Sequence, residues 1–241
     1  MPLFFVLSGY FSNGKKEPFK KYFIKNARNL LIPYFTFYII TLPLSYYGLY
    51  LKGAEGYNSA SDFLLKPIFG LFTIESTPYS FNANYALWFF VTLFIVKMIF
   101  YVPKIFEVNR WSIFLTCFIC IVLLMVIKHF NIYIYGRLDR ALMAFPMFAI
   151  GYLLHTHTRI ISQLTKLSII QKLVIGLLMY ALCYLGVLMN GHISFGGVHF
   201  GNSLLLTYAI ALVGVFATVC IADTISSNKY FLTIGRRQQS F

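Results

Sequence analysis

Charged residues are scarce in this chain of 241 residues, and acidic residues are the scarcest of them. Asp, Glu, Lys and Arg together make up 11% of the sequence, with 7 acidic residues against 20 basic ones. Soluble domains carry about 25% charged residues, which they need to cover their surface. The shortage therefore argues against a soluble enzyme, a disordered tail and a fibrous repeat.

Several motifs that carry chemistry are also missing. No Gly-Lys-Ser/Thr follows a glycine-rich segment, which excludes a P-loop. No charged segment precedes the first apolar run, so no cleavable signal peptide is predicted. His155 and His157 have no third metal ligand nearby in the sequence, and we predict no metal site. The four cysteines all lie within apolar runs, where they are expected to act as small apolar filler. They are Cys117, Cys120, Cys183 and Cys220.

Long apolar runs dominate the sequence instead. Hydrophobic residues make up 59% of the chain, and a helix needs about 20 predominantly apolar residues to cross a bilayer. Seven runs stand out, of which six are long enough to cross and the first forms only a partial span. The sequence therefore predicts an all-α, polytopic transmembrane helix bundle whose first partner is the lipid bilayer. The runs are 1–12, 29–51, 85–103, 112–130, 138–155, 173–189 and 202–222.

The basic residues follow the connections between these runs. A net charge of +13 could indicate nucleic-acid binding, but basic residues in short connections are what the positive-inside rule predicts, and we expect no nucleic-acid partner. Alternate connections and the C-terminal tail hold 14 of the basic residues, and the opposite connections hold 5. Lys97 lies inside a run and is expected to reach the side that holds Lys104. The first connection and the C-terminus are therefore predicted to be cytoplasmic.

Two connections on the predicted outer side have compositions that predict their structure, and two glycines within the runs predict how helices pack. Residues 63–72 are apolar but too short to cross, which favours an interfacial or re-entrant segment. The glycine-rich loop 190–202 is typical of backbone that lines or closes a cavity. Gly9 and Gly151 predict close packing between neighbouring helices.

The first run resembles a known signature. Residues 1–11, Met-Pro-Leu-Phe-Phe-Val-Leu-Ser-Gly-Tyr-Phe, resemble the second span of acyltransferase family 3, the integral membrane O-acyltransferases that include fucose 4-O-acetylase-like enzymes. Four further segments follow in the order of that family, so that the resemblance covers the whole chain and predicts a single domain over 1–241. These segments are 25–34, 86–90, 144–152 and 231–236.

The chain departs from the family at both ends. The family's first span carries an Arg and the His to which its catalysis is attributed, and neither that span nor the family's last one matches a part of this sequence. The first run measures about 18 Å against a hydrocarbon core of about 30 Å. We therefore expect a fragment that lacks residues upstream, with little or no activity of its own. Lys25 stands where the family tends to have a second Arg.

The resemblance implies a donor and an acceptor on opposite sides of the membrane. The donor is acetyl-CoA, used as a substrate and not as a tightly bound cofactor, and Arg28, Lys25 and Lys21 are the candidates to bind its phosphates. The alternative for these residues is membrane topology with attraction to anionic lipid. The implied acceptor is a hydroxyl of a saccharide or lipid-linked saccharide of the cell envelope, and the implied location is the bacterial plasma membrane.

Three residues on the predicted outer side are candidates to bind that acceptor. They are Trp88, Asp139 and Arg140. Trp88 could instead be an aromatic-belt residue that anchors the helix at the membrane surface, and Asp139 and Arg140 could pair with each other without binding a ligand.

For the whole chain, a transporter or flippase subunit of saccharide export remains an alternative, although we find no internal repeat of the kind that transporters show. A remnant without function is a third reading.

Overall fold

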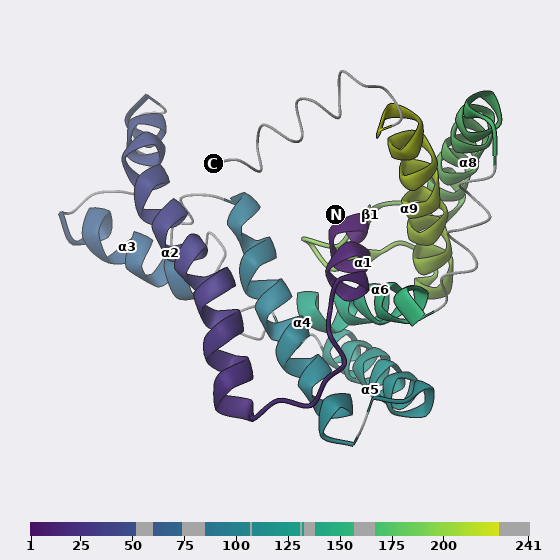
Figure 1. The fold of residues 1–241 in the computed structure, drawn as a ribbon. Helices are drawn as coiled ribbons and strands as arrows, with labels where there is room; N and C mark the ends of the chain where they lie inside the picture. Colours follow the sequence, from purple (N-terminus) through teal and green to yellow (C-terminus); the bar gives the residue numbers. More distant parts are fainter. Residues whose placement is uncertain are drawn as a thin grey trace. The chain divides into compact units, whose positions relative to one another are not determined.

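The computed structural model describes residues 1–51, 60–73, 85–106, 108–130, 132, 138–156 and 167–226. Helices account for most of these residues (Figure 1), which confirms the predicted all-α class. Each of the seven apolar runs forms a helix. In chain order the elements are α1 (Pro2–Tyr10), α2 (Phe19–Leu51), α3 (Ala60–Thr73), the 3-10 helix η1 (Tyr85–Leu87), α4 (Trp88–Ile105), α5 (Arg110–His129), α6 (Leu138–Thr156), α8 (Ile169–Asn190), β1 (Ile193–Ser194), β2 (His199–Phe200) and α9 (Leu204–Ser226).

Several of these helices have the length and composition of membrane spans. Among the described residues, five helices are long and apolar enough to cross a bilayer: α2, α4, α5, α8 and α9. The chain is thus an integral membrane protein. The sixth predicted span, α6, is 19 residues long but begins with the charged pair Asp139 and Arg140. A span needs sufficient length and also a predominantly apolar composition, and the charged residues at the start of α6 lower the apolar share of that helix.

The helix that carries the second predicted span begins ten residues before the predicted apolar run. We placed the start of that run at residue 29 and assigned the basic residues before it to a loop, whereas α2 begins at Phe19. Lys and Arg are good helix formers, so the helix continues past the apolar segment. Bilayer thickness determines the apolar length of a span, but it does not limit the length of the helix. Lys21, Lys25 and Arg28 are therefore helical residues with defined positions around one axis.

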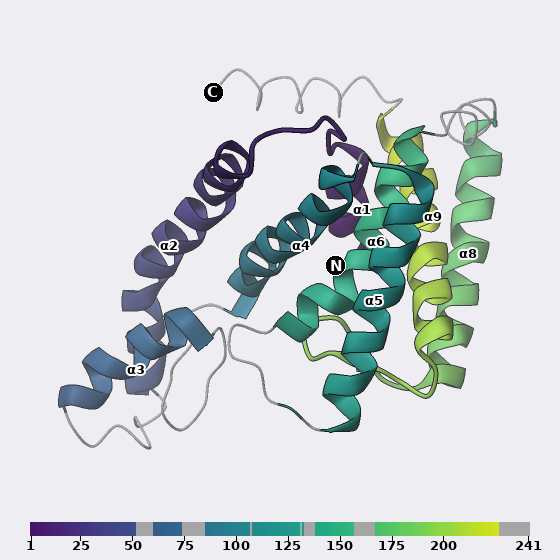
Figure 2. The same ribbon diagram turned by 90° about the horizontal axis from the view of Figure 1, so that it is seen from below.

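The structure forms two compact units, Asn13–Pro146 and a second one made of Met1–Ser12 with Met147–Phe241. We call them the α2–α5 unit and the α8–α9 unit, and α6 contributes to both. In the α2–α5 unit, α2 and α4 pack side by side (Figure 2). Every fourth residue of α2 is buried, as expected for one face of a helix. These residues are Tyr22, Asn26, Leu30, Tyr34 and Tyr38.

The short helix α3 is bonded to the second half of α2. The Tyr34 hydroxyl donates to the Leu71 carbonyl oxygen at 2.6 Å, and the Tyr38 hydroxyl donates to the Pro67 carbonyl oxygen at 2.7 Å. At 14 residues α3 is too short to cross a bilayer. Its interfacial or re-entrant position stays a prediction.

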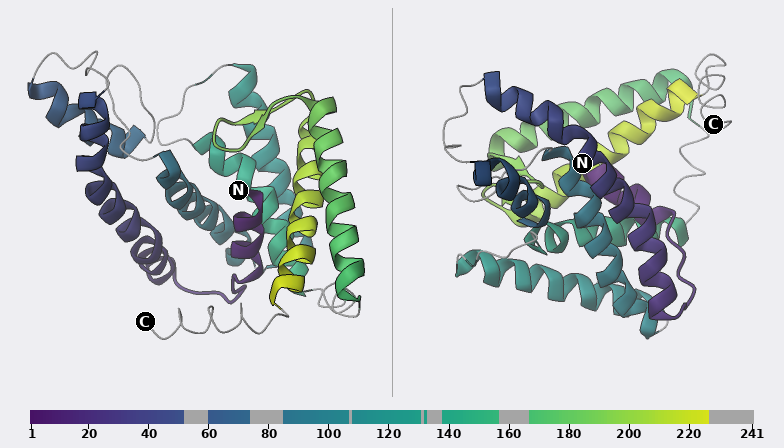
Figure 3. Two further views of the ribbon diagram at one scale, coloured as in Figure 1. Left: turned by 90° about the horizontal axis from the view of Figure 1, so that it is seen from above. Right: turned by 90° about the vertical axis from the view of Figure 1, so that its left-hand side faces the viewer.

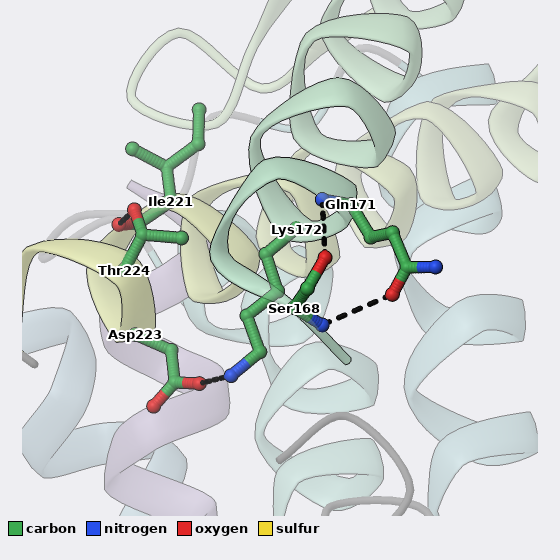
Figure 4. Close-up of polar contacts among 6 residues, drawn as sticks. All are labelled: Ser168, Gln171, Lys172, Ile221, Asp223 and Thr224. Carbon is green, nitrogen blue, oxygen red and sulfur yellow. Dashed lines mark hydrogen bonds and ion pairs between the residues drawn. The ribbon is translucent and has the colours of Figure 1, made fainter. Parts of the chain in front are cut away.

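In the α8–α9 unit, α8 and α9 run antiparallel along their whole length (Figure 3). Polar pairs join them at regular intervals. Lys172 Nζ lies 2.6 Å from an Asp223 carboxylate oxygen beside the Ser168 capping box that begins α8 (Figure 4). Further along, the hydroxyls of Tyr180 and Thr218 are 2.8 Å apart. Polar contacts of this kind help to align helices that have no hydrophobic driving force between them.

The glycine-rich loop after α8 is a short antiparallel hairpin of β1 and β2. It is held by Asn190, which is fully buried. The Asn190 amide donates to the Phe200 carbonyl at 3.0 Å and to the Thr207 hydroxyl at 2.8 Å, while its oxygen accepts the Ser203 backbone N–H at 2.8 Å. Gly201 has a positive φ and lies against the Asn190 carbonyl, where a side chain would collide. The loop is thus an ordered cap on the α8–α9 pair, and its predicted relation to a cavity stays a prediction.

Two glycines bring α1 against the Met147–Thr156 part of α6 in the same unit. A methyl group on Gly9 would overlap the backbone carbonyl of Phe148, and one on Gly151 would overlap the backbone carbonyl of Val6. The two contacts are reciprocal, since each helix presents a glycine to the main chain of the other. They confirm the close packing that these glycines predict.

Candidate functional site

The three predicted donor-binding residues share one exposed face of α2. Lys21, Lys25 and Arg28 are exposed in the first turns of the helix. The spacings of four and three residues place them on the same side, because an α-helix turns about 100° per residue. The structure therefore brings these three cations together at the start of α2.

Two further lysines lie in α4, next to the start of α2. Lys104 is buried at 3% exposure, and Lys97 is half-buried two turns before it. The Lys104 ammonium lies 4.4 Å from the centre of the Tyr22 ring, which is the geometry of a cation–π contact. The Tyr22 hydroxyl donates to the Lys97 carbonyl at 3.0 Å, and the Tyr101 hydroxyl donates to the Glu17 carbonyl at 3.1 Å. Two tyrosines thus join the start of α2 to the end of α4.

The charges around this contact do not balance. Lys25 acts electrostatically on both Lys97 and Lys104, and Glu17 acts on Lys104. One carboxylate oxygen of Glu17 is buried and has no hydrogen-bond donor within the described ranges. Among the described residues, Glu17 therefore compensates Lys104 alone, and no carboxylate acts on Lys97. We call Lys25, Lys97, Lys104, Glu17 and Tyr22 the lysine cluster.

The predicted acceptor residues lie at the other end of α4. Trp88, the first residue of that helix, is buried, and the Arg140 guanidinium lies 5.3 Å from its ring centre. Arg140 is itself only 6% exposed. Asp139 accepts the backbone N–H of Arg140 at 3.0 Å at the start of α6. The burial of Trp88 within the α2–α5 unit argues against an aromatic-belt anchor, since such anchors lie at the lipid surface.

The two groups of residues are separated by the length of one helix. Trp88 and Lys104 are 16 positions apart in α4, which corresponds to about 24 Å at the helical rise of 1.5 Å per residue. That distance approaches the thickness of the hydrocarbon core, about 30 Å. A cationic group and an aromatic–guanidinium group therefore lie at opposite ends of a helix that is long and apolar enough to cross a bilayer.

Lys97 and Lys104 were not predicted from the sequence as binding residues. The signal was available, because the two are seven positions apart and so lie on one helix face. An ionisable residue inside a span also indicates a functional role more often than a structural one. For metals, the described ranges contain no group of three or more His, Cys, Asp or Glu residues. His157, one of the weighed histidines, lies outside these ranges.

Comparison with protein-family models matches residues 1–236 to the acyltransferase domain of acyltransferase family 3. The match covers nearly the whole chain and agrees with the resemblance that residues 1–11 carry. Neither a curated protein nor a solved structure matches the chain significantly.

Proposed function

Because the chain belongs to acyltransferase family 3, we propose that this membrane acyltransferase moves an acetyl group from acetyl-CoA to a hydroxyl of an envelope saccharide or lipid-linked saccharide. The observation that carries the proposal is the placement of a cationic group and an aromatic–guanidinium group at the two ends of α4. A donor used in the cytoplasm and an acceptor outside it require such a separation.

Acetyl transfer to a hydroxyl exchanges one bond at the acyl carbon for another. The acceptor oxygen attacks the thioester carbonyl, the new C–O bond forms, and the C–S bond breaks to release the CoA thiol. The hydroxyl proton passes to a general base, and the departing sulfur takes up a proton. General-base assistance contributes about 10²–10⁴-fold to the rate of such steps. We assign to this chain the binding of the two substrates and no base.

The donor contacts lie at the start of α2. Coenzyme A carries phosphate groups, and Arg28 can bind a phosphate through two parallel N–H bonds. Lys21 and Lys25 supply point charges on the same exposed face. This end of α2 is the cytoplasmic one by the positive-inside count, which is where the donor would be found. The same count supports a cytoplasmic C-terminus, and the family membership supports a location in the bacterial plasma membrane.

The acceptor contacts lie around Trp88. An indole ring can stack on the apolar face of a sugar, and a buried Arg offers several donors in a fixed arrangement to sugar oxygens. The Arg140 guanidinium lies over the Trp88 ring, while the Asp139 side chain accepts the Arg140 backbone N–H. In the proposed complex, these residues position the saccharide hydroxyl and do not react with it.

The test is donor-dependent acetylation in membranes of source cells that express the protein from its native locus. Radiolabelled acetyl-CoA is supplied, and label is measured in the isolated envelope saccharides. Arg28→Ala should lower the rate at limiting acetyl-CoA by about 10–100-fold, the loss expected for a charge-assisted contact. Lys128→Ala, which removes a cation at the end of α5, is the matched control and should leave the rate within twofold.

Absence of labelled saccharide in wild-type membranes, with acetyl-CoA at saturation, would refute the transferase proposal. A transporter would instead move a saccharide that is already acetylated, and its transport would not require acetyl-CoA. Arg140→Lys keeps the charge but changes the fork of donors over Trp88. We expect it to raise the KM for the acceptor and to leave the KM for acetyl-CoA unchanged.

A further inference from the structure

The lysine cluster places more positive charge inside the protein than its single carboxylate can balance. Lys104 is almost fully buried and Lys97 is half-buried, while the exposed Lys25 acts on both. In the part of the chain that the structure describes, neither the Lys97 nor the Lys104 ammonium has a hydrogen-bond acceptor or a carboxylate within ion-pair distance. A buried charge without a partner is costly, and proteins retain one where a ligand or another charge compensates it.

A contrast within the same chain sharpens this point. Lys172 is also a buried lysine near a helix end, but its ammonium lies 2.6 Å from the Asp223 carboxylate. The fold therefore provides a direct partner for one buried lysine. Among the described residues, Lys104 has an aromatic face, that of Tyr22, and the Glu17 carboxylate, which acts on it from beyond ion-pair distance.

We propose that Lys97 and Lys104, with Lys25 at the entrance, bind a phosphate group at this end of α4. A phosphate offers several acceptor oxygens and up to two negative charges, so it can satisfy two ammonium groups at once. Among the described residues the cluster has a net positive charge, because it holds three lysines and one glutamate, and that glutamate acts on Lys104. The ligand belongs to one of two sources with the same chemistry: the phosphates of the acyl-CoA donor or the headgroup of an anionic lipid.

The position of the cluster favours the donor, and this assignment rests on the proposed function. Lys25 belongs both to the exposed basic face of α2 and to the cluster. A ligand that carries several phosphates could contact Arg28 on that face and Lys104 behind Tyr22 at the same time. The headgroup of phosphatidylglycerol has one phosphate and would occupy the lysines alone.

The test measures phosphate binding directly and does not depend on transfer. The protein is purified from the source membranes in neutral detergent with phosphatidylcholine, and its thermal unfolding is followed with and without coenzyme A. Lys97→Met and Lys104→Met keep the length of the side chain and remove the charge. We expect each to weaken coenzyme A binding by about 10–100-fold, the range for a lost charge-assisted hydrogen bond. Lys128→Met serves as the charge-matched control and should change binding less than twofold.

The unfolding temperature of the unliganded protein is a second measurement, which distinguishes a loss of binding from misfolding of the variant. Since neither ammonium group has a carboxylate within ion-pair distance among the described residues, each Met variant should unfold at a temperature equal to or above that of the wild type when no anion is present. On addition of a fixed concentration of coenzyme A, the wild type and Lys128→Met should then gain more stability than Lys97→Met or Lys104→Met, because the stabilisation by a ligand increases with the ratio of its concentration to its Kd.

Three outcomes are informative. Weaker binding of coenzyme A by the variants supports the site with the donor as its source. Unchanged coenzyme A binding, together with loss of co-purified phosphatidylglycerol, supports the phosphate site with lipid as its source. Unchanged binding of both would overturn the proposal. If the wild type binds coenzyme A through these lysines but transfers no acetyl group, the phosphate site stands and the transferase proposal fails.

Discussion

Adding one methyl group at the crossing of α1 and α6 should measurably destabilise the protein. At Gly9 the methyl would overlap the Phe148 carbonyl, and at Gly151 it would overlap the Val6 carbonyl. Both obstacles are backbone atoms inside helices, so they cannot rotate away as the end of a flexible side chain could. The helices would have to separate by on the order of 1 Å, and dispersion contacts along the interface would weaken.

The magnitude follows from two opposing terms. Overpacking costs about 1–3 kcal/mol and more where backbone is involved, whereas Gly→Ala inside a helix contributes up to about 1 kcal/mol of stability. We expect a net loss of about 1–3 kcal/mol for Gly9→Ala and for Gly151→Ala. At about 2–4 °C per kcal/mol for a chain of this size, the melting temperature of the purified protein in detergent should fall by roughly 3–10 °C.

Because the two contacts are reciprocal, the double variant Gly9→Ala with Gly151→Ala should lose less stability than the sum of the two single variants. Once one methyl has moved the helices apart, the second meets less resistance, so the combined loss should fall short of the sum by at least about 1 kcal/mol. Gly214→Ala is the matched control in the same unit, because its methyl would meet only the Cys183 sulfur at 3.5 Å. That variant should melt at or above the wild-type temperature. Equal melting of all three single variants would refute the packing argument.

Two further predictions concern the hairpin and the orientation in the membrane. Asn190→Ala removes the amide bonds to Phe200 and Thr207, and we expect it to cost about 2–4 kcal/mol and to speed limited proteolysis within 191–203; Asn202→Ala, on an exposed side chain, should not. For orientation, a membrane-impermeant maleimide added to intact cells should label His192→Cys and not Lys15→Cys. The reverse pattern would invert the predicted topology, and with it the assignment of donor and acceptor ends.

Much of the helical architecture could be predicted because the bilayer imposes a simple rule. Backbone groups in lipid must be satisfied within the helix, and about 20 apolar residues are needed to cross. The runs at 85–103 and 112–130 therefore corresponded closely to α4 and α5. The start of α2 was missed because no such rule acts on the part of a helix outside the lipid.

The candidate site was predicted only in part, for a related reason. The type of residue and the alternation of basic connections were enough to assign Lys21, Lys25 and Arg28 to one side of the chain's apolar runs and Trp88 to the other, although the three cations were expected in a loop and lie in α2. Neither feature reveals which side chains are covered, because burial depends on partners far away in the chain. Tyr22 reaches Lys97 over 75 positions, and no local pattern encodes such a contact.

By itself, then, the sequence determined the family, the helical class and the placement of charge along the chain, since these follow from composition, period and motif. Only the tertiary structure decided that Lys104 lies buried against Tyr22 and that Arg140 covers Trp88. The physical reason is that the cost of a buried charge depends on the groups packed around it, and packing brings those groups together from separate helices.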